Sequence, residues 1–164
     1  MKKFFIIALF LIISVLIQHV THELLHVLVG RLMGFKLKRI QWFSYYGGTR
    51  VFFENEPEIS DDSSDIPKEW FLTSAAGIVG TTLLGYISVF IFAVIPTNLF
   101  RLFMWVLSIM LMLTDCSYAL AGSAGNFGDM CCIGKYLKWS RKKKTAVSLV
   151  LFIVNCIIVK SVLF

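Results

Sequence analysis

Four long apolar stretches alternate with polar segments along the chain. They cover residues 4–33, 70–95, 99–134 and 145–164. About 20 helical residues cross the hydrocarbon core of a bilayer, because each residue adds about 1.5 Å to the length of a helix. Each stretch is therefore long enough to span a membrane. The pattern predicts an all-α membrane protein with about four transmembrane helices, formed as a single integral-membrane domain over residues 1–164.

The first and third stretches differ from simple spans. Residues 4–33 follow Lys2 and Lys3, as the apolar part of a signal peptide would, but no small-residue cleavage site interrupts them. We therefore expect a retained helix that is long or tilted. The stretch 99–134 is too long for one straight crossing, and its segment 121–128 is rich in glycine and serine. This composition predicts that the third span is broken near its cytoplasmic end, in a place lined by protein or by a water-filled cavity.

The polar segment between the first two spans predicts a β-hairpin. Residues 36–40 and 49–53 have strand character, and residues 45–48 are typical of a turn between them. The acidic residues 54–65 then predict a solvated loop. We expect a short, membrane-associated hairpin directly after the first span.

Composition and charge agree with a membrane protein. Apolar residues make up 57% of the chain, against about 45–50% in soluble domains. Most of the 16 lysines and arginines lie in the segments 31–68 and 135–144, which places both segments in the cytoplasm and both termini outside. We interpret the basic run 141–144 as a topology anchor, and no nucleic-acid partner is expected.

Three acidic residues lie in or beside the apolar stretches, whereas the other seven lie between residues 54 and 69. The three are Glu23, Asp115 and Asp129. Ionisable groups at membrane depth are costly and are usually retained for function. These carboxylates are therefore the first candidates for chemistry.

Two histidines flank Glu23 in the first span. His22 and His26 are four residues apart, so they share one face of a helix and can bind one metal ion. In this motif the two imidazoles hold Zn²⁺, which makes bound water acidic, and the glutamate next to the first histidine acts as general base. The sequence predicts a catalytic zinc site with Glu23 as its base.

The third zinc ligand is expected from a distant segment. No histidine follows His26, which leaves Asp129 and Asp115. His22 lies about 13 Å and Asp129 about 9 Å from the cytoplasmic ends of their helices, so Asp129 is favoured and the deeper Asp115 is the alternative. His19 shares the face of His22 and is a further alternative: it could contact a ligand from outside, serve as a spare ligand or line a water path, and a role other than ligand is favoured.

The chain resembles a minimal member of the site-2 protease family of intramembrane zinc metalloproteases. Besides the histidine motif, the similarity covers Gly34 and Gly47-Gly48 of the hairpin, Ala76-Gly77, and the broken third helix. The family carries its second motif there, with a proline and an Asp-Gly pair. This chain has Asn126-Phe127-Gly128-Asp129, without the proline and with Gly and Asp in reverse order. The resemblance implies that Asp129 completes the zinc site and that Asn126 positions the substrate.

The expected function is hydrolysis of peptide bonds within or near transmembrane segments of other membrane proteins, as in regulated intramembrane proteolysis. The expected partners are a transmembrane protein or peptide substrate and the lipid bilayer. The expected location is the plasma membrane of a prokaryote, with the active site towards the cytoplasmic side. Two other functions stay open: a non-catalytic metal-binding scaffold, and a metal or proton transporter, for which the usual internal repeats are missing.

Overall fold

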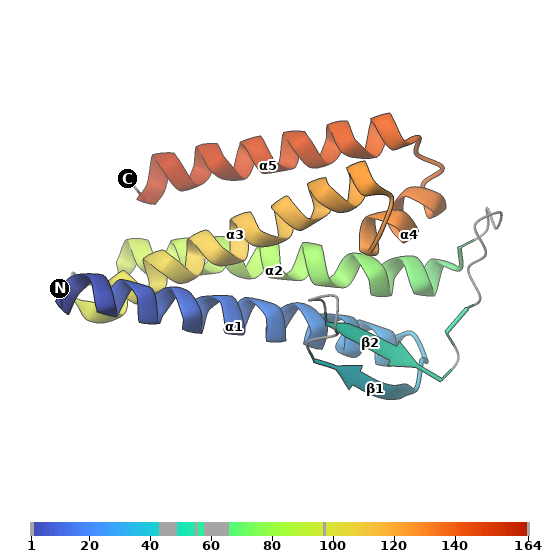
Figure 1. Cartoon of the computed structure of the whole chain (residues 1–164), viewed down its shortest axis with the longest axis horizontal. Helices are drawn as coiled ribbons and strands as arrows, with labels where there is room; N and C mark the ends of the chain where they lie inside the picture. Colours follow the sequence, from blue (N-terminus) through green and yellow to red (C-terminus); the bar gives the residue numbers. More distant parts are fainter. Residues whose placement is uncertain (1, 43–48, 55, 58–65, 97, 164) are drawn as a thin grey trace.

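The computed structural model describes residues 2–42, 49–54, 56–57, 66–96 and 98–163. Its elements are α1 (Lys2–Leu32), β1 (Leu37–Gln41), β2 (Arg50–Phe53), α2 (Lys68–Val94), α3 (Leu99–Gly125), α4 (Asp129–Tyr136) and α5 (Arg141–Leu163). The four long helices run side by side along the molecule (Figure 1). α1, α2 and α3 pack against one another, and α5 packs against α3. Both termini lie at one end of the bundle, and the hairpin and α4 lie at the other.

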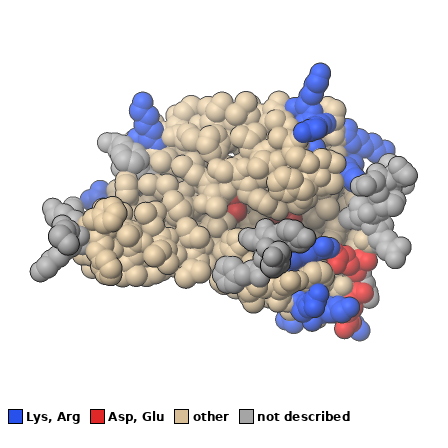
Figure 2. Space-filling view, in the orientation of Figure 1, with Lys and Arg blue, Asp and Glu red and all other residues tan. Residues whose placement is uncertain are grey.

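Within the described residues, four helices are long and apolar enough to cross a membrane, judged by length and composition: Phe4–Leu32, Lys68–Val94, Leu99–Gly125 and Arg141–Val162. Large apolar side chains, such as Phe4, Leu28 and Phe90, are exposed on the outside of the bundle. Figure 2 shows an uncharged surface over the middle of the molecule, with lysine and arginine gathered towards its ends. The prediction of four long apolar helices is confirmed.

The helix α5 begins at Arg141, four residues before the predicted start at 145. Hydropathy detects only the apolar part of a helix, whereas arginine and lysine are good helix formers and make up the first turn here. The basic run is also more than a surface anchor. Lys144 is 3% exposed, and its ammonium donates a hydrogen bond to Asn126 Oδ1.

The predicted hairpin is present. β1 and β2 pair in an antiparallel manner, with Leu37 opposite Phe53 and Gln41 opposite Arg50. Phe53 packs against Trp70 of α2, and its ring lies where a side chain at Gly30 of α1 would be. The hairpin is thereby fixed on the C-terminal half of α1. The predicted turn 45–48 and most of the acidic loop 54–65 lie outside the described residues.

The predicted break in the third apolar stretch lies at residues 126–128. Asn126 has a left-handed conformation (φ 61°) and ends α3, with the backbone N–H groups of Asn126 and Phe127 both donating to Gly122 O. Gly128 also has a positive φ of 61°, and the Tyr118 hydroxyl lies where its Cβ would be, so only glycine fits here. The chain turns sharply at this point, and Asp129 becomes the first residue of α4.

Candidate metal centre

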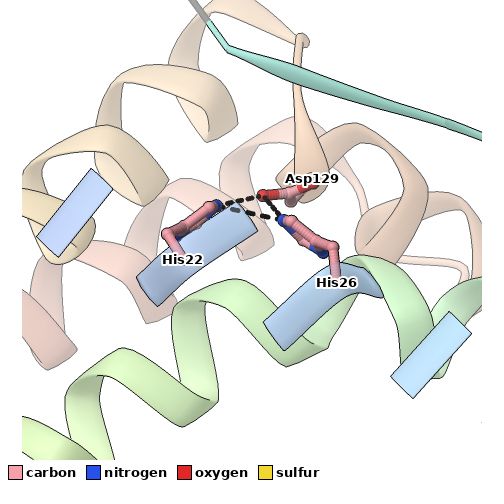
Figure 3. Close-up of side chains that lie close together, drawn as sticks. All are labelled: His22, His26 and Asp129. Carbon is pink, nitrogen blue, oxygen red and sulfur yellow. Dashed lines mark hydrogen bonds and ion pairs between the residues drawn. The ribbon is translucent and has the colours of Figure 1, made fainter. Parts of the chain in front are cut away.

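Three potential metal ligands meet between α1 and α4. His22 and His26 come from successive turns of α1, and Asp129 comes from the start of α4 (Figure 3). The distance between the two Nε2 atoms is 3.1 Å. Asp129 Oδ2 lies 3.2 Å from His22 Nε2 and 3.3 Å from His26 Nε2. The structure therefore brings together the two predicted histidines and the favoured aspartate.

These separations fit a tetrahedral zinc ion. Bonds of about 2.0–2.1 Å at tetrahedral angles hold the ligand atoms about 3.3 Å apart. The two imidazoles are 7% and 8% exposed, which shields them from competing water. Two nitrogens and one carboxylate oxygen form a donor set typical of catalytic zinc, which leaves the fourth position for water. The residues present therefore fit the metal that the sequence predicts.

Gly77 of α2 makes room for the two imidazoles. A Cβ atom at this position would lie 2.6 Å from His22 Nε2 and 2.6 Å from His26 Nε2. Small residues at 77, 81 and 85 line one face of α2, as expected for close helix packing. Gly77 also leaves the space that the two Nε2 atoms occupy.

Gly77→Ala is therefore expected to weaken zinc binding, because its methyl group would push both Nε2 atoms from their positions. The matched control is Gly80→Ala, one turn further along α2, whose Cβ would have the flexible Leu25 side chain as its nearest neighbour, 2.6 Å from Cδ1. Zinc affinity is measured by competition with a chelator, and helix content by circular dichroism. Equal zinc affinity in the two variants would contradict this role for Gly77.

The second ring nitrogen of each histidine faces the protein interior. His26 Nδ1 lies 2.6 Å from the carbonyl oxygen of Thr73, to which it can donate a hydrogen bond. His22 Nδ1 lies 3.1 Å from Asp115 Oδ2. With the ring proton on Nδ1, each Nε2 is free to bind a metal. The metal-facing and protein-facing sides of both rings are thus defined by the packing of α1 against α2 and α3.

Asp115 lies at the level of His22, contrary to the expectation that α3 carries it to another depth. It contacts the ring from the Nδ1 side, whereas Asp129 contacts the ring from the Nε2 side. An imidazole has a nitrogen on each side, so two acids from different elements can both reach it. Asp115 also accepts hydrogen bonds from Gln18 and Thr81 and is not part of the three-ligand group.

Glu23 and His19 line the cavity next to the ligand group. Glu23 is 7% exposed and directly follows His22 in the chain, which agrees with the position of a general base. His19 is half-buried and does not belong to the group of three ligands. Glu23 thus lies beside the three ligands and stays the predicted general base. The structure does not bring His19 into the ligand set.

Asn126 stays a predicted substrate-positioning residue. It ends α3, its side chain accepts a hydrogen bond from Lys144, and it is not among the residues that line the cavity. The structure therefore gives Asn126 a role in connecting α3 with α5, and no support for substrate binding. Sequence reasoning missed Gln18, Thr73 and Thr81. Gln18 could have been noticed as a polar residue one helical turn before His22.

A cavity of about 870 Å³ opens over the ligand group. Its lining comes from α1, α2, α3 and α4, and also from Arg50, Val51 and Phe53 of β2. β2 crosses above the three ligands in Figure 3. In Figure 2, acidic atoms are recessed in the middle of an otherwise uncharged surface. The site is thus buried within the bundle and lies at the base of a cavity.

Comparison of the chain with models of protein families, with curated proteins and with solved structures found no match.

Proposed function

We propose that the protein is a four-span intramembrane zinc metalloprotease that hydrolyses peptide bonds in transmembrane segments of other proteins. The observation that carries the proposal is the convergence of His22, His26 and Asp129, with Glu23 beside them, inside a bundle of membrane-length apolar helices. Buried ionisable groups of this kind are costly in a membrane and mark functional sites. The positive segments 31–68 and 135–144 support a cytoplasmic position for the hairpin end of the bundle.

In this function His22, His26 and Asp129 hold the zinc ion. The metal, when bound, makes water nucleophilic at neutral pH and polarises the scissile carbonyl. Glu23 accepts the proton of the attacking water and passes it to the leaving amine. The low exposure of the ligands keeps bulk water from competing with the substrate for the site. These roles account for each ionisable group of the motif.

The substrate must be locally unwound before it can react. An intact helix keeps its carbonyl groups in internal hydrogen bonds, so a scissile carbonyl must first leave them. β2 offers a place for the unwound segment, because it lines the cavity and one of its two edges is not paired with another described strand. An extended peptide can add to such an edge through main-chain hydrogen bonds. The preferred substrate is therefore a transmembrane helix with helix-breaking residues near the cytoplasmic end.

The test combines metal analysis with a cleavage assay. Protein purified in detergent is expected to contain one zinc ion per chain and to cut a fluorescent transmembrane peptide that carries a Gly-Pro break near one end. A zinc chelator is expected to stop cleavage, and added zinc to restore it. Zinc bound without cleavage of any such peptide would favour a metal-binding scaffold. Wild-type protein without affinity for zinc would overturn the proposal.

A further inference from the structure

Asp115 is an acid in the middle of a membrane-length helix, where a carboxylate is expensive to bury. It is 2% exposed, and the proposed chemistry does not use it. Its oxygens are held from two other helices: Gln18 of α1 donates to Oδ1 over 2.6 Å, and Thr81 of α2 donates to Oδ2. Two neutral donors reduce the cost of burying the carboxylate but leave its charge in place. The charge itself therefore calls for a function.

The nearest group that this charge can act on is His22. Asp115 Oδ2 lies 3.1 Å from Nδ1, the ring nitrogen that faces away from the other ligands. The contact does not have the direction of a well-formed hydrogen bond, and Nδ1 has no other partner among the described residues. Proximity and charge therefore define the interaction. A negative charge at this distance favours a proton on Nδ1 and leaves Nε2 as the metal-binding atom.

His22 and His26 differ in this respect. The Nδ1 of His26 faces a neutral backbone carbonyl, that of Thr73, whereas the Nδ1 of His22 faces the carboxylate of Asp115. A carboxylate behind a metal-binding imidazole makes its ligand nitrogen more basic and fixes the ring. Of the two imidazoles, His22 should therefore be the stronger ligand, because of a residue that lies on another helix and far away in the sequence.

We propose that Asp115 is a positioning residue that acts on the metal through His22: its charge strengthens His22 as a ligand, and Gln18 and Thr81 hold the carboxylate in place. The inference rests on the metal centre of the proposed function and does not depend on proteolysis. It assigns Asp115 a role distinct from that of the ligand Asp129.

Asp115→Asn isolates the charge. The amide has the same shape as the carboxylate, and its oxygen can still accept from Thr81. Its NH₂ group would then face Gln18, whose Oε1 has no hydrogen-bond partner among the described residues and can accept after a rotation of the amide. The link between the three helices can thus survive, while the negative charge beside His22 is lost.

The experiment measures zinc affinity by chelator competition and records the visible spectrum of the Co²⁺-loaded protein. Asp115→Asn is expected to bind zinc about 10- to 100-fold more weakly than wild type and to shift the Co²⁺ absorption bands, since the donor strength of His22 changes. Asp115→Glu, which keeps a carboxylate at this position, is expected to bind zinc more tightly than Asp115→Asn. The control is Ser108→Ala, a fully buried position of the same helix whose hydroxyl donates to Met104 O, and it should leave affinity and spectrum unchanged.

The outcomes separate the inference from the proposed function. Wild-type affinity and an unchanged spectrum in Asp115→Asn would overturn the role of Asp115 and leave the metal centre standing. A wild-type protein that binds neither zinc nor Co²⁺ would overturn both. If Asp115→Asn does not fold, Thr81→Val takes its place, because it removes one bond to the carboxylate and should weaken zinc binding to a smaller extent. Wild-type affinity in that variant would count against the inference.

Discussion

Replacement of Glu23 by Gln is expected to abolish peptide cleavage while one zinc ion per chain remains bound. Glutamine has nearly the shape of glutamate, but its amide cannot accept the proton of the attacking water. General acid–base groups contribute about 10²- to 10⁴-fold to a rate, and the proposed reaction assigns both proton transfers to Glu23. The ligands His22, His26 and Asp129 are untouched, so the zinc content should stay at the wild-type level. The measurements are zinc content by mass spectrometry and cleavage of the transmembrane peptide.

Glu69→Gln is the matched control. Glu69 is an exposed acid in the first turn of α2, outside the cavity, and the same chemical change there should leave cleavage intact. Cleavage by Glu23→Gln at the wild-type rate would show that another group carries the proton. Loss of zinc from Glu23→Gln would instead show that Glu23 belongs to the metal site, and the assignment of its role would be wrong.

The elements that sequence predicts well are those set by local patterns. Long apolar runs gave the four long helices, and strand-forming residues around a turn gave the hairpin to within one or two residues. The start of α5 was missed because its first turn is basic, and hydropathy does not distinguish a charged helical turn from a loop. The break before Asp129 was predictable because closely spaced glycines disfavour a helix, and the apolar stretch is too long to cross the bilayer without one.

The candidate site divides along a similar line. The histidine pair could be predicted because a spacing of four residues on one helix places both side chains on the same face. The residues that surround the rings could not, since the contacts of Thr73 and Gly77 depend on how α2 packs against α1. The bond from Thr81 to Asp115 depends on how α2 packs against α3. Depth along a helix was also an incomplete guide to Asp115. A comparison of depths ignores the size of the imidazole ring, whose two nitrogens face different helices in His22.

The two membrane-depth aspartates are expected to differ when each is replaced by alanine. Asp129→Ala removes a ligand whose oxygen lies 3.2 and 3.3 Å from the two Nε2 atoms, so zinc binding and cleavage should both be lost. The drop in affinity should exceed the roughly 100-fold that loss of a ligand's hydrogen-bonding partner can cost. Asp115→Ala removes the carboxylate behind His22 and its hydrogen bonds to Gln18 and Thr81, but no metal ligand. This variant should still bind one zinc ion at saturating concentration, with lower affinity.

Both variants are measured side by side by chelator competition, with helix content checked in the metal-free state. The contrast follows from the chain reversal at 126–128, which places Asp129 on the Nε2 side of the histidines, whereas the continuous α3 leaves Asp115 on the Nδ1 side of His22. Asp115 cannot take the place of the carboxylate that Asp129→Ala removes, because the imidazole of His22 lies between Asp115 and the metal position. If Asp115→Ala loses zinc at saturation and Asp129→Ala retains it, the ligand assignment is reversed, and the ring of His22 must bind the metal through Nδ1.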